Sequence, residues 1–275
     1  MDELKFLTDG MPIRRDKKRG YENAHEILDE MNLDGIEVEF VQGVRMSEKS
    51  RQVVKDASKK YVFTAHGPFF INLNAREQEK IDASITRIID TATVANEFGG
   101  YSITYHAAFY LGNDKDVVFK RVADRTAQII EILEKDNNKI WIRPETTGKA
   151  TQWGDIDEII KLSKEFKQVL PCVDFSHIHA RSGGAFNTYD EFCEILEKIA
   201  TNLGDEAINN FHAHLAGIAY TAKGEKNHLP LEESDMNYKD LLKAMKNFNV
   251  KGVVVCESPN IEDDCKLISD YYKSL

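Results

Sequence analysis

Short apolar runs alternate with amphipathic stretches along the whole chain. The apolar runs have the length and the bounding turn residues of strands, and the amphipathic stretches carry apolar residues at helical spacing. The pattern predicts eight strands, each followed by a helix. The expected strands are Leu4–Thr8, Gly35–Val41, Tyr61–Ala65, Tyr101–Tyr105, Lys139–Glu145, Val169–Asp174, Ile208–Leu215 and Lys251–Cys256. The expected helices are Tyr21–Met31, 47–58, Arg76–Glu97, Val117–Lys135, Asp155–Gln168, Tyr189–Thr201, Tyr238–Phe248 and Ile261–Tyr272.

This rhythm predicts an α/β fold with a parallel sheet. Strand, helix and strand between residues 139 and 179 form one βαβ unit, and the alternation continues through the 275 residues. We therefore expect a single (β/α)8 TIM barrel over residues 1–275, with its site at the C-terminal face of the strands. Two doubly wound halves would need a linker, and no linker-like segment interrupts the pattern.

Metal-capable side chains recur where the predicted strands end. A lone histidine at one strand end is most often structural, but six consecutive strands end on such residues. In a barrel these ends meet on one face. The six are His66, His106, Glu145, Asp174, His214 and Glu257, and His177 and His228 lie in the loops after the sixth and seventh strands.

Imidazole and carboxylate ligands without cysteine suit Zn²⁺, with Mn²⁺ or Mg²⁺ as alternatives. Eight ligands exceed the needs of one tetrahedral ion, so we expect two or three ions per chain. Such clusters recur where phosphate esters are hydrolysed, because one ion prepares a hydroxide nucleophile and another neutralises the departing alkoxide.

Several segments resemble the endonuclease IV family of apurinic/apyrimidinic-site endonucleases. The matching segments are His66-Gly67-Pro68-Phe69-Phe70-Ile71-Asn72-Leu73, Glu145-Thr146-Thr147-Gly148, Asp174-Phe175-Ser176-His177, His214-Leu215 and Glu257-Ser258-Pro259. They run in the family's order from about the third strand to the eighth. The resemblance implies a metal-dependent hydrolase that cleaves the phosphodiester on the 5′ side of an abasic site during DNA base excision repair.

The resemblance also implies a role for each ligand. His66, His106 and Glu145 would hold one zinc, and Glu145 would bridge to a second zinc held by Asp174, His214 and Glu257. A third zinc would be held by His177 and His228. Glu145 would in addition orient the attacking hydroxide, which makes it the expected catalytic residue.

Three departures mark a divergent member. The family has an aspartate two residues before its last zinc-binding histidine, and this chain has Lys226 there. Glu225 could replace that aspartate after a small loop shift, or the third site could be weak or empty. His212 is a second candidate on the strand of His214, which ranks first because a leucine follows it. Ala216-Gly217 replaces asparagine-aspartate, and Thr8-Asp9-Gly10 replaces the family's usual first-strand histidine motif.

Contacts to DNA are expected from the strand-end loops. By the resemblance, Phe69 and Phe70 lie where the family inserts side chains into the duplex, although two aromatics could equally anchor a loop. Arg14, Arg15, the run 17–19 and Arg45 are candidate phosphate contacts by position alone. The net charge of −10 argues mildly against binding nucleic acid by bulk electrostatics.

A sugar isomerase or epimerase of the xylose-isomerase-like barrels is the alternative. It would need Glu145, Asp174, His214 and Glu257 alone, with one or two divalent ions, and the acidic charge favours it. His66, His106 and His177 argue against it, because a four-ligand site does not require them. The chain has no apolar run that would span a membrane and no signal-peptide pattern, so we expect a cytoplasmic protein. The resemblance to the endonuclease IV family implies that it acts as a monomer.

Overall fold

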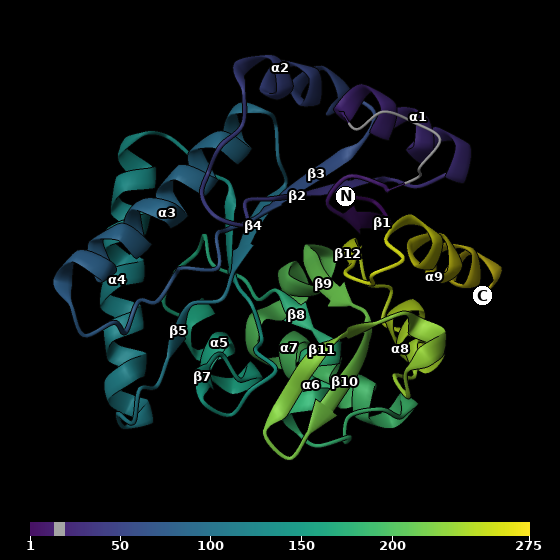
Figure 1. Ribbon diagram of the computed structural model, residues 1–275. Helices are drawn as coiled ribbons and strands as arrows, with labels where there is room; N and C mark the ends of the chain where they lie inside the picture. Colours follow the sequence, from purple (N-terminus) through teal and green to yellow (C-terminus); the bar gives the residue numbers. More distant parts are fainter. Residues whose placement is uncertain (14–19) are drawn as a thin grey trace. The chain divides into compact units, whose positions relative to one another are not determined.

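The computed structural model describes residues 1–13 and 20–275 (Figure 1). Its contacts group the chain into two compact units, unit 1 with residues 1–37 and 172–275 and unit 2 with residues 38–171. The expectation of a single domain therefore stays a prediction.

Unit 1 contains parallel strands in the order β2-β1-β12-β9-β8. Its strands are β1 (Leu4–Asp9), the first three residues of β2 (Gly35–Glu39), β8 (Val173–Asp174), β9 (Phe211–Leu215) and β12 (Gly252–Cys256). Its helices are α1 (Tyr21–Met31), α6 (Phe175–Arg181), α7 (Tyr189–Asn209), the short 3-10 helix η1 (Leu231–Glu233), α8 (Tyr238–Asn247) and α9 (Glu262–Ser274). The antiparallel hairpin of β10 (Gly217–Thr221) and β11 (Gly224–Leu229) follows β9.

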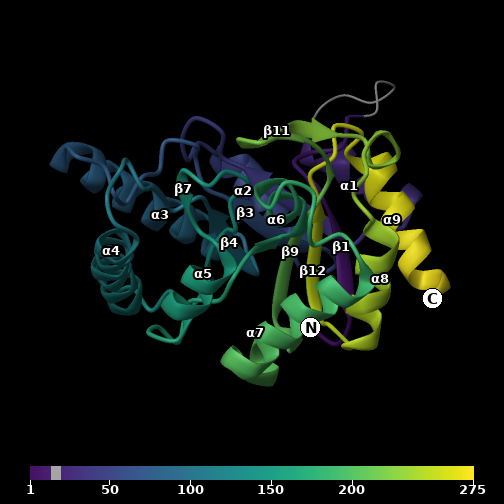
Figure 2. The ribbon, with the colours of Figure 1, turned by 90° about the horizontal axis from the view of Figure 1, so that it is seen from below.

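Unit 2 has the strand order β6-β4-β3-β2. Its strands are β3 (Val62–His66), β4 (Ser102–Tyr105), β6 (Trp141–Pro144) and the short pair β5 (Ala108–Phe109) and β7 (Gln152–Trp153). Its helices are α2 (Glu48–Ala57), α3 (Gln78–Glu97), α4 (Lys115–Lys135) and α5 (Ile156–Ser163). The long helices α3 and α4 pack side by side, as both ribbon views show (Figures 1 and 2).

The predicted helices form largely where the spacing places them. α1 spans Tyr21–Met31 as expected, and its buried residues Ala24, Ile27 and Leu28 lie on one face. Ser47 caps α2, because its side chain accepts a hydrogen bond from the Ser50 amide at 3.1 Å. The helix predicted over Asp155–Gln168 is shorter, since α5 ends at Ser163, although its expected start is fixed by the Asp155–Glu158 capping box.

Two segments, one after the sixth predicted strand and one after the seventh, differ from the prediction. Residues after Asp174 form helix α6 rather than a loop, because the Asp174 side chain caps that helix. The segment after β9 forms the β10–β11 hairpin. None of the helices within residues 1–13 and 20–275 is both long and apolar enough to cross a membrane.

Candidate metal centre

In unit 2, three metal-capable side chains converge at the carboxyl ends of neighbouring strands. His66 is the last residue of β3, and His106 and Glu145 directly follow β4 and β6. Nε2 of His66 lies 3.1 Å, and Nε2 of His106 lies 3.4 Å, from Oε2 of Glu145. The Glu145 side chain is fully buried and that of His66 is 6% exposed. We call these three residues the unit 2 set.

Both ring nitrogens of His66 face oxygens that accept hydrogen bonds. Its Nδ1 lies 2.8 Å from the carbonyl oxygen of Gly67, which can only accept a hydrogen bond. The Glu145 carboxylate on the Nε2 side also only accepts, and a neutral imidazole carries one proton, so it can donate to one of these two oxygens and not to both. When Nδ1 donates to Gly67, the lone pair of Nε2 faces the Glu145 carboxylate. Two lone-pair atoms at 3.1 Å are stabilised by a cation between them. The unit 2 set therefore fits a divalent ion.

A second group lies in unit 1 at the ends of β8, β9 and β12. Ligand atoms of Asp174, His214 and Glu257 all lie within 4.8 Å of one another. Nδ1 of His214 is 2.9 Å from Oε1 of Glu257. Asp174 and His214 are buried, and the Glu257 side chain is 9% exposed. Two carboxylates and an imidazole in a buried space form a donor set that suits a divalent ion.

A third group shares Asp174 and adds His177 and His228, whose ligand atoms also lie within 4.8 Å of one another. His177 lies on α6 and His228 on β11, so the prediction that both lie in loops was wrong. Asp174 Oδ1 accepts the His177 amide at 2.7 Å, and Oδ2 lies 3.0 Å from Nδ1 of His177. His228 Nδ1 lies 3.1 Å from the Glu257 carbonyl oxygen, and its buried Nε2 has no hydrogen-bond partner among the described residues.

A register shift in the hairpin decides which residue stands beside His177. Ala219 pairs with Asn227 and Tyr220 pairs with Glu225, so Lys226 is the extra residue of a β-bulge. The extra residue places Glu225 and His228 on one face, although residues three apart in a regular strand point to opposite faces. Oε2 of Glu225 lies 3.5 Å from Nε2 of His177, and Lys226 is exposed. The structure thus places the Glu225 carboxylate beside His177, where the Lys226 ammonium could not serve as a ligand.

We expect Glu225→Gln to weaken one ion of the centre by at least about tenfold, because it removes a charged donor beside His177 and His228. Lys226→Gln is the matched control and should leave that affinity unchanged, since the Lys226 side chain is exposed. Elemental analysis after gel filtration at limiting metal measures the ions retained by each variant. Equal ion content in Glu225→Gln and the parent would exclude Glu225 as a ligand.

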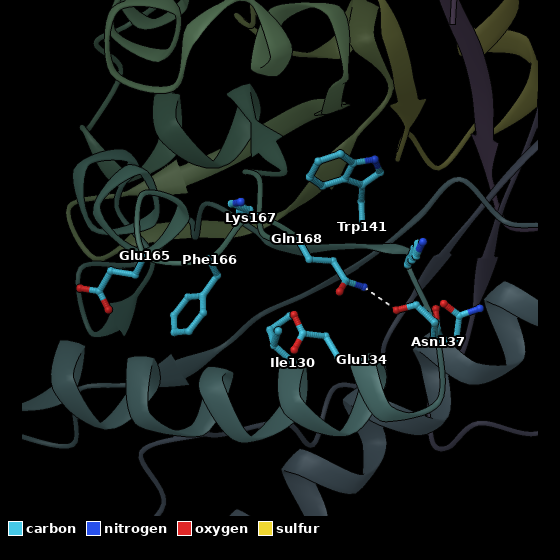
Figure 3. A pocket seen from close by; sticks show the side chains of 10 residues that line it. Ile130, Glu134, Asn137, Trp141, Glu165, Phe166, Lys167 and Gln168 are labelled. Atoms are coloured by element: carbon cyan, nitrogen blue, oxygen red, sulfur yellow. Dashed lines mark hydrogen bonds between the residues drawn. The ribbon is translucent and has the colours of Figure 1, made fainter.

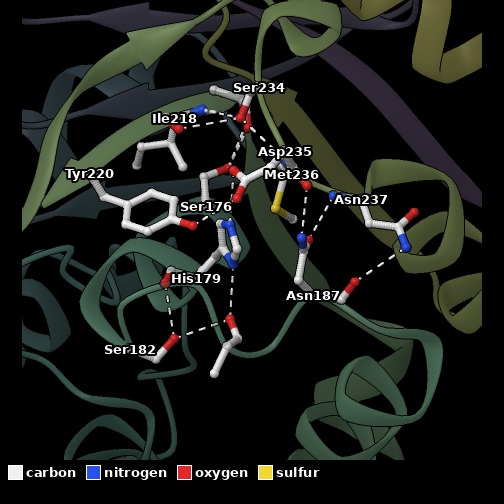
Figure 4. A network of polar contacts seen from close by, with 12 residues as sticks. Ser176, His179, Ser182, Asn187, Ile218, Tyr220, Ser234, Asp235, Met236 and Asn237 are labelled. Atoms are coloured by element: carbon white, nitrogen blue, oxygen red, sulfur yellow. Dashed lines mark hydrogen bonds and ion pairs between the residues drawn. The ribbon is translucent and has the colours of Figure 1, made fainter.

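A polar network fastens α6 to the hairpin and to the segment after η1 (Figure 4). His179 Nε2 lies 3.2 Å from Asp235 Oδ1, and the Tyr220 hydroxyl donates to Asp235 Oδ2 at 2.7 Å. Ser176 on α6 donates to the Ala216 carbonyl and accepts from the Ala216 amide, each at 2.8 Å. These contacts fix the elements that carry His177 and His228.

The sequence interpretation missed Glu37 on β2. Its carboxylate is fully buried, with Oε1 2.9 Å from His214 Nε2 and Oε2 3.2 Å from His212 Nε2. Burial alone would raise the pKa of Glu37, but His214 and His212 outweigh it and hold that pKa well below its ordinary value. The burial of Glu37 could have been expected from the sequence. Both faces of a strand in a parallel sheet are covered, so a glutamate within such a strand is buried.

Some of the expected DNA contacts are exposed in the structure, and the others lie outside the residues that it describes. Phe69 and Phe70 in the loop after β3 are 61% and 63% exposed. They line a surface pocket of about 460 Å³ together with Phe109 and Arg87. Arg45 is exposed in the segment between β2 and α2. The remaining predicted contacts, Arg14, Arg15 and the run 17–19, lie outside the described residues.

A larger pocket of about 630 Å³ in unit 2 lies at the other end of β6 (Figure 3). Trp141, the first residue of β6, lines it together with residues from the end of α4 and from the segment after α5. Glu145 follows the opposite end of the same strand. In barrels the amino ends of the strands serve stability rather than chemistry, so we assign this pocket no role in the site.

The alternation of strands and helices, with ligands at the carboxyl ends of the strands, defines an α/β protein of the TIM-barrel class. Residues 26–274 match the xylose isomerase-like TIM barrel family, and the chain belongs to that family. Over 272 residues it is 46% identical to the "Uncharacterized protein MJ0133" of Methanocaldococcus jannaschii, covering 99% of this chain and 98% of that protein.

Two solved structures share the fold at low sequence identity. Endonuclease IV from Thermus thermophilus superposes with a TM-score of 0.75 and 14% identity, over 99% of this chain and 100% of that one. A D-tagatose 3-epimerase-like protein superposes with a TM-score of 0.75 and 20% identity, over 98% and 97% of the two chains. The family resemblance and the TIM-barrel prediction are thereby confirmed. The structural neighbours include both an endonuclease IV and a D-tagatose 3-epimerase-like protein.

Proposed function

We propose that the protein is a metal-dependent endonuclease that hydrolyses the phosphodiester 5′ to an abasic site in DNA. The observation that carries this proposal is the unit 2 set. Its two imidazoles and one buried carboxylate exist in addition to the donors Asp174, His214 and Glu257 of unit 1. A sugar-binding site with one ion does not require a second donor set, whereas hydrolysis of a phosphodiester uses more than one ion.

The side chains of this protein would act mainly by holding the divalent ions and by orienting the attacking water. Divalent ions, when bound, lower the pKa of water and neutralise negative charge that develops on the phosphate and on the departing oxygen. Glu145 is buried between two imidazoles, so its carboxylate would orient the attacking water as well as hold the ion. Asp174 caps α6 by accepting the His177 amide, and its Oδ2 lies 3.0 Å from Nδ1 of the His177 imidazole.

The loops beside the unit 2 set supply a surface that suits DNA. Phe69 and Phe109 each lie three residues after a histidine of the set. Together with Phe70 they present exposed aromatic faces, and Arg87 holds the loop by donating to the Phe70 carbonyl at 3.2 Å. Aromatic side chains at such an edge can occupy the gap left in a base stack, and they stack on bases without reading sequence.

We expect the double substitution Phe69→Ala, Phe70→Ala to weaken binding of an abasic duplex by about 5- to 150-fold for each ring that stacks on a base, from the loss of about 1–3 kcal/mol per stacked base. Binding is measured by fluorescence anisotropy in the presence of Ca²⁺, which is intended to slow cleavage. Phe119→Leu, in the largely buried side of α4, serves as a control for losing one aromatic ring. Unchanged affinity in the double variant would show that the two rings only anchor the loop.

A divalent-metal sugar epimerase is the second candidate. The observation that favours it is the completeness of Asp174, His214 and Glu257, which alone provide one imidazole and two carboxylates for an ion. In that reaction carboxylates transfer a proton to and from a carbon of a small ketose. His66→Ala separates the candidates, because a nuclease would lose a ligand of the unit 2 set whereas an epimerase would keep its ion.

The deciding experiment incubates metal-replete protein with an end-labelled duplex that contains one abasic site. The proposal expects a nick confined to the 5′ side, with a 3′-hydroxyl that a polymerase extends. An undamaged duplex of the same sequence is the control. If no nick forms with Zn²⁺, Mn²⁺ or Mg²⁺, the endonuclease proposal is wrong, and conversion of a ketose in a parallel screen would establish the epimerase.

A further inference from the structure

Glu37 is a buried carboxylate that shares its two oxygens between two histidines of one strand. His212 and His214 lie two residues apart on β9, so their side chains point to the same face. Each directs its Nε2 at a different oxygen of Glu37, at 3.2 Å and 2.9 Å. All three side chains are completely buried. Burial of a charge is costly unless it is paired, and this arrangement sets an imidazole beside each oxygen of Glu37.

The backbone holds Glu37 rigidly in this position. Glu37 is paired with Asp9 of the neighbouring strand β1, and its carbonyl oxygen accepts the Gly10 amide at 2.9 Å. β9 is fixed in turn between β8 and β12. A carboxylate mounted on one strand and two imidazoles mounted on another therefore keep their relative orientation without a flexible loop.

The contact to Glu37 places the imidazole proton. A carboxylate ionised at neutral pH only accepts hydrogen bonds, so Glu37 favours the tautomer of His214 in which Nε2 carries the proton, with Oε1 of Glu37 at 2.9 Å and Nε2 of His212 at 3.2 Å from that nitrogen. In a neutral imidazole this leaves the lone pair on Nδ1. For His214 that atom is the one that lies 2.9 Å from Oε1 of Glu257 and close to Asp174. Glu257 on the Nδ1 side competes for the proton only while no cation lies between them.

We propose that Glu37 is the positioning residue of the unit 1 metal site, because it fixes His214 in the tautomer whose Nδ1 binds the cation. His212 completes the arrangement by occupying the second oxygen of Glu37, which prevents the carboxylate from turning toward the ion. The inference rests on the metal-binding part of the proposed function and not on the nature of the substrate. It applies equally to a nuclease and to an epimerase.

Glu37→Gln is the informative substitution, because it keeps the size of the side chain and replaces one accepting oxygen with an amide that donates. One of the two histidines must then present a lone pair to that amide and move its proton to Nδ1. We expect about a 10- to 100-fold loss of affinity for one Zn²⁺ or Co²⁺ ion, the usual effect of removing a carboxylate behind a metal-binding histidine. The ion of the unit 2 set should be retained.

The measurement uses the full chain without DNA. Titration of the metal-free protein with Co²⁺, followed by its visible absorption, gives the affinity, and ¹⁵N spectra of histidine-labelled protein report which ring nitrogen is protonated. Glu262→Gln is the control, since it neutralises another buried carboxylate of unit 1, one that accepts the Ile13 amide at 2.9 Å. Glu37→Asp should recover part of the affinity, because it restores two accepting oxygens.

Three results would overturn the inference. They are unchanged Co²⁺ affinity in Glu37→Gln, a proton on Nδ1 of His214 in the metal-loaded parent protein, and loss of the same ion in Cys172→Ser. The last would place that ion at Cys172, His212 and His214, whose ligand atoms also lie within 4.8 Å of one another. If Glu37→Gln does not fold, the ¹⁵N spectra of the parent still decide. A parent protein that binds Co²⁺ through His214 but nicks no abasic duplex would support Glu37 and contradict the proposed reaction.

Discussion

Glu145→Gln is expected to lower the rate of abasic-site nicking by about 10²–10³-fold or more, the loss that follows removal of one electrostatic group at a reacting centre. The reason lies in the contacts of Glu145. Its carboxylate meets Nε2 of His66 at 3.1 Å and Nε2 of His106 at 3.4 Å, and it is fully buried. The substituted amide has no charge to hold a cation there, and its NH₂ group cannot accept a proton from water.

Single-turnover nicking of an abasic duplex at saturating metal measures this effect. Circular dichroism and thermal melting should show an intact fold, because glutamine has nearly the same volume as glutamate. Glu131→Gln is the matched control, since Glu131 is exposed on α4 and pairs with Lys135 at 2.7 Å. Activity equal to that of the parent in Glu145→Gln would remove Glu145 from the mechanism.

Removal of divalent ions is expected to abolish activity and to lower the melting temperature by roughly 10 °C. A cation present at about a thousandfold over its Kd stabilises the folded state by about 4 kcal/mol, and each kcal/mol shifts Tm by about 2–4 °C in a protein of this size. The physical cause is the set of buried carboxylates, among them Asp174 and Glu257. Without a cation they repel each other within 4.8 Å.

Differential scanning calorimetry before and after dialysis against a chelator measures this shift. Re-addition of Zn²⁺, Mn²⁺ or Mg²⁺ one at a time then shows which ion restores both Tm and nicking. A chelator-treated protein of proven low metal content that melts at the same temperature and still nicks DNA would contradict the metal centre as a whole. Mg²⁺ alone restoring both would contradict the expectation of zinc.

The strand-and-helix order was accessible from local patterns. Helix α1 and the cap at Ser47 appear where spacing and side-chain chemistry place them, because both depend on residues within a few positions of one another. The ligand candidates could also be selected in advance, since parallel strands present their carboxyl ends on one side and a histidine or carboxylate at each end is visible in the sequence. The match of residues 26–274 confirms the family and with it the fold class.

Tertiary structure decided the features that depend on pairing between distant residues. The bulge at Lys226 exists only in the register of β10 against β11, and this register turns Glu225 toward His177. Glu37 likewise lies in a strand where apolar and acidic residues alternate, and that local pattern does not reveal its partners. The two histidines that share its carboxylate follow 175 and 177 positions later on β9, so their contact is fixed by strand packing and by no local spacing.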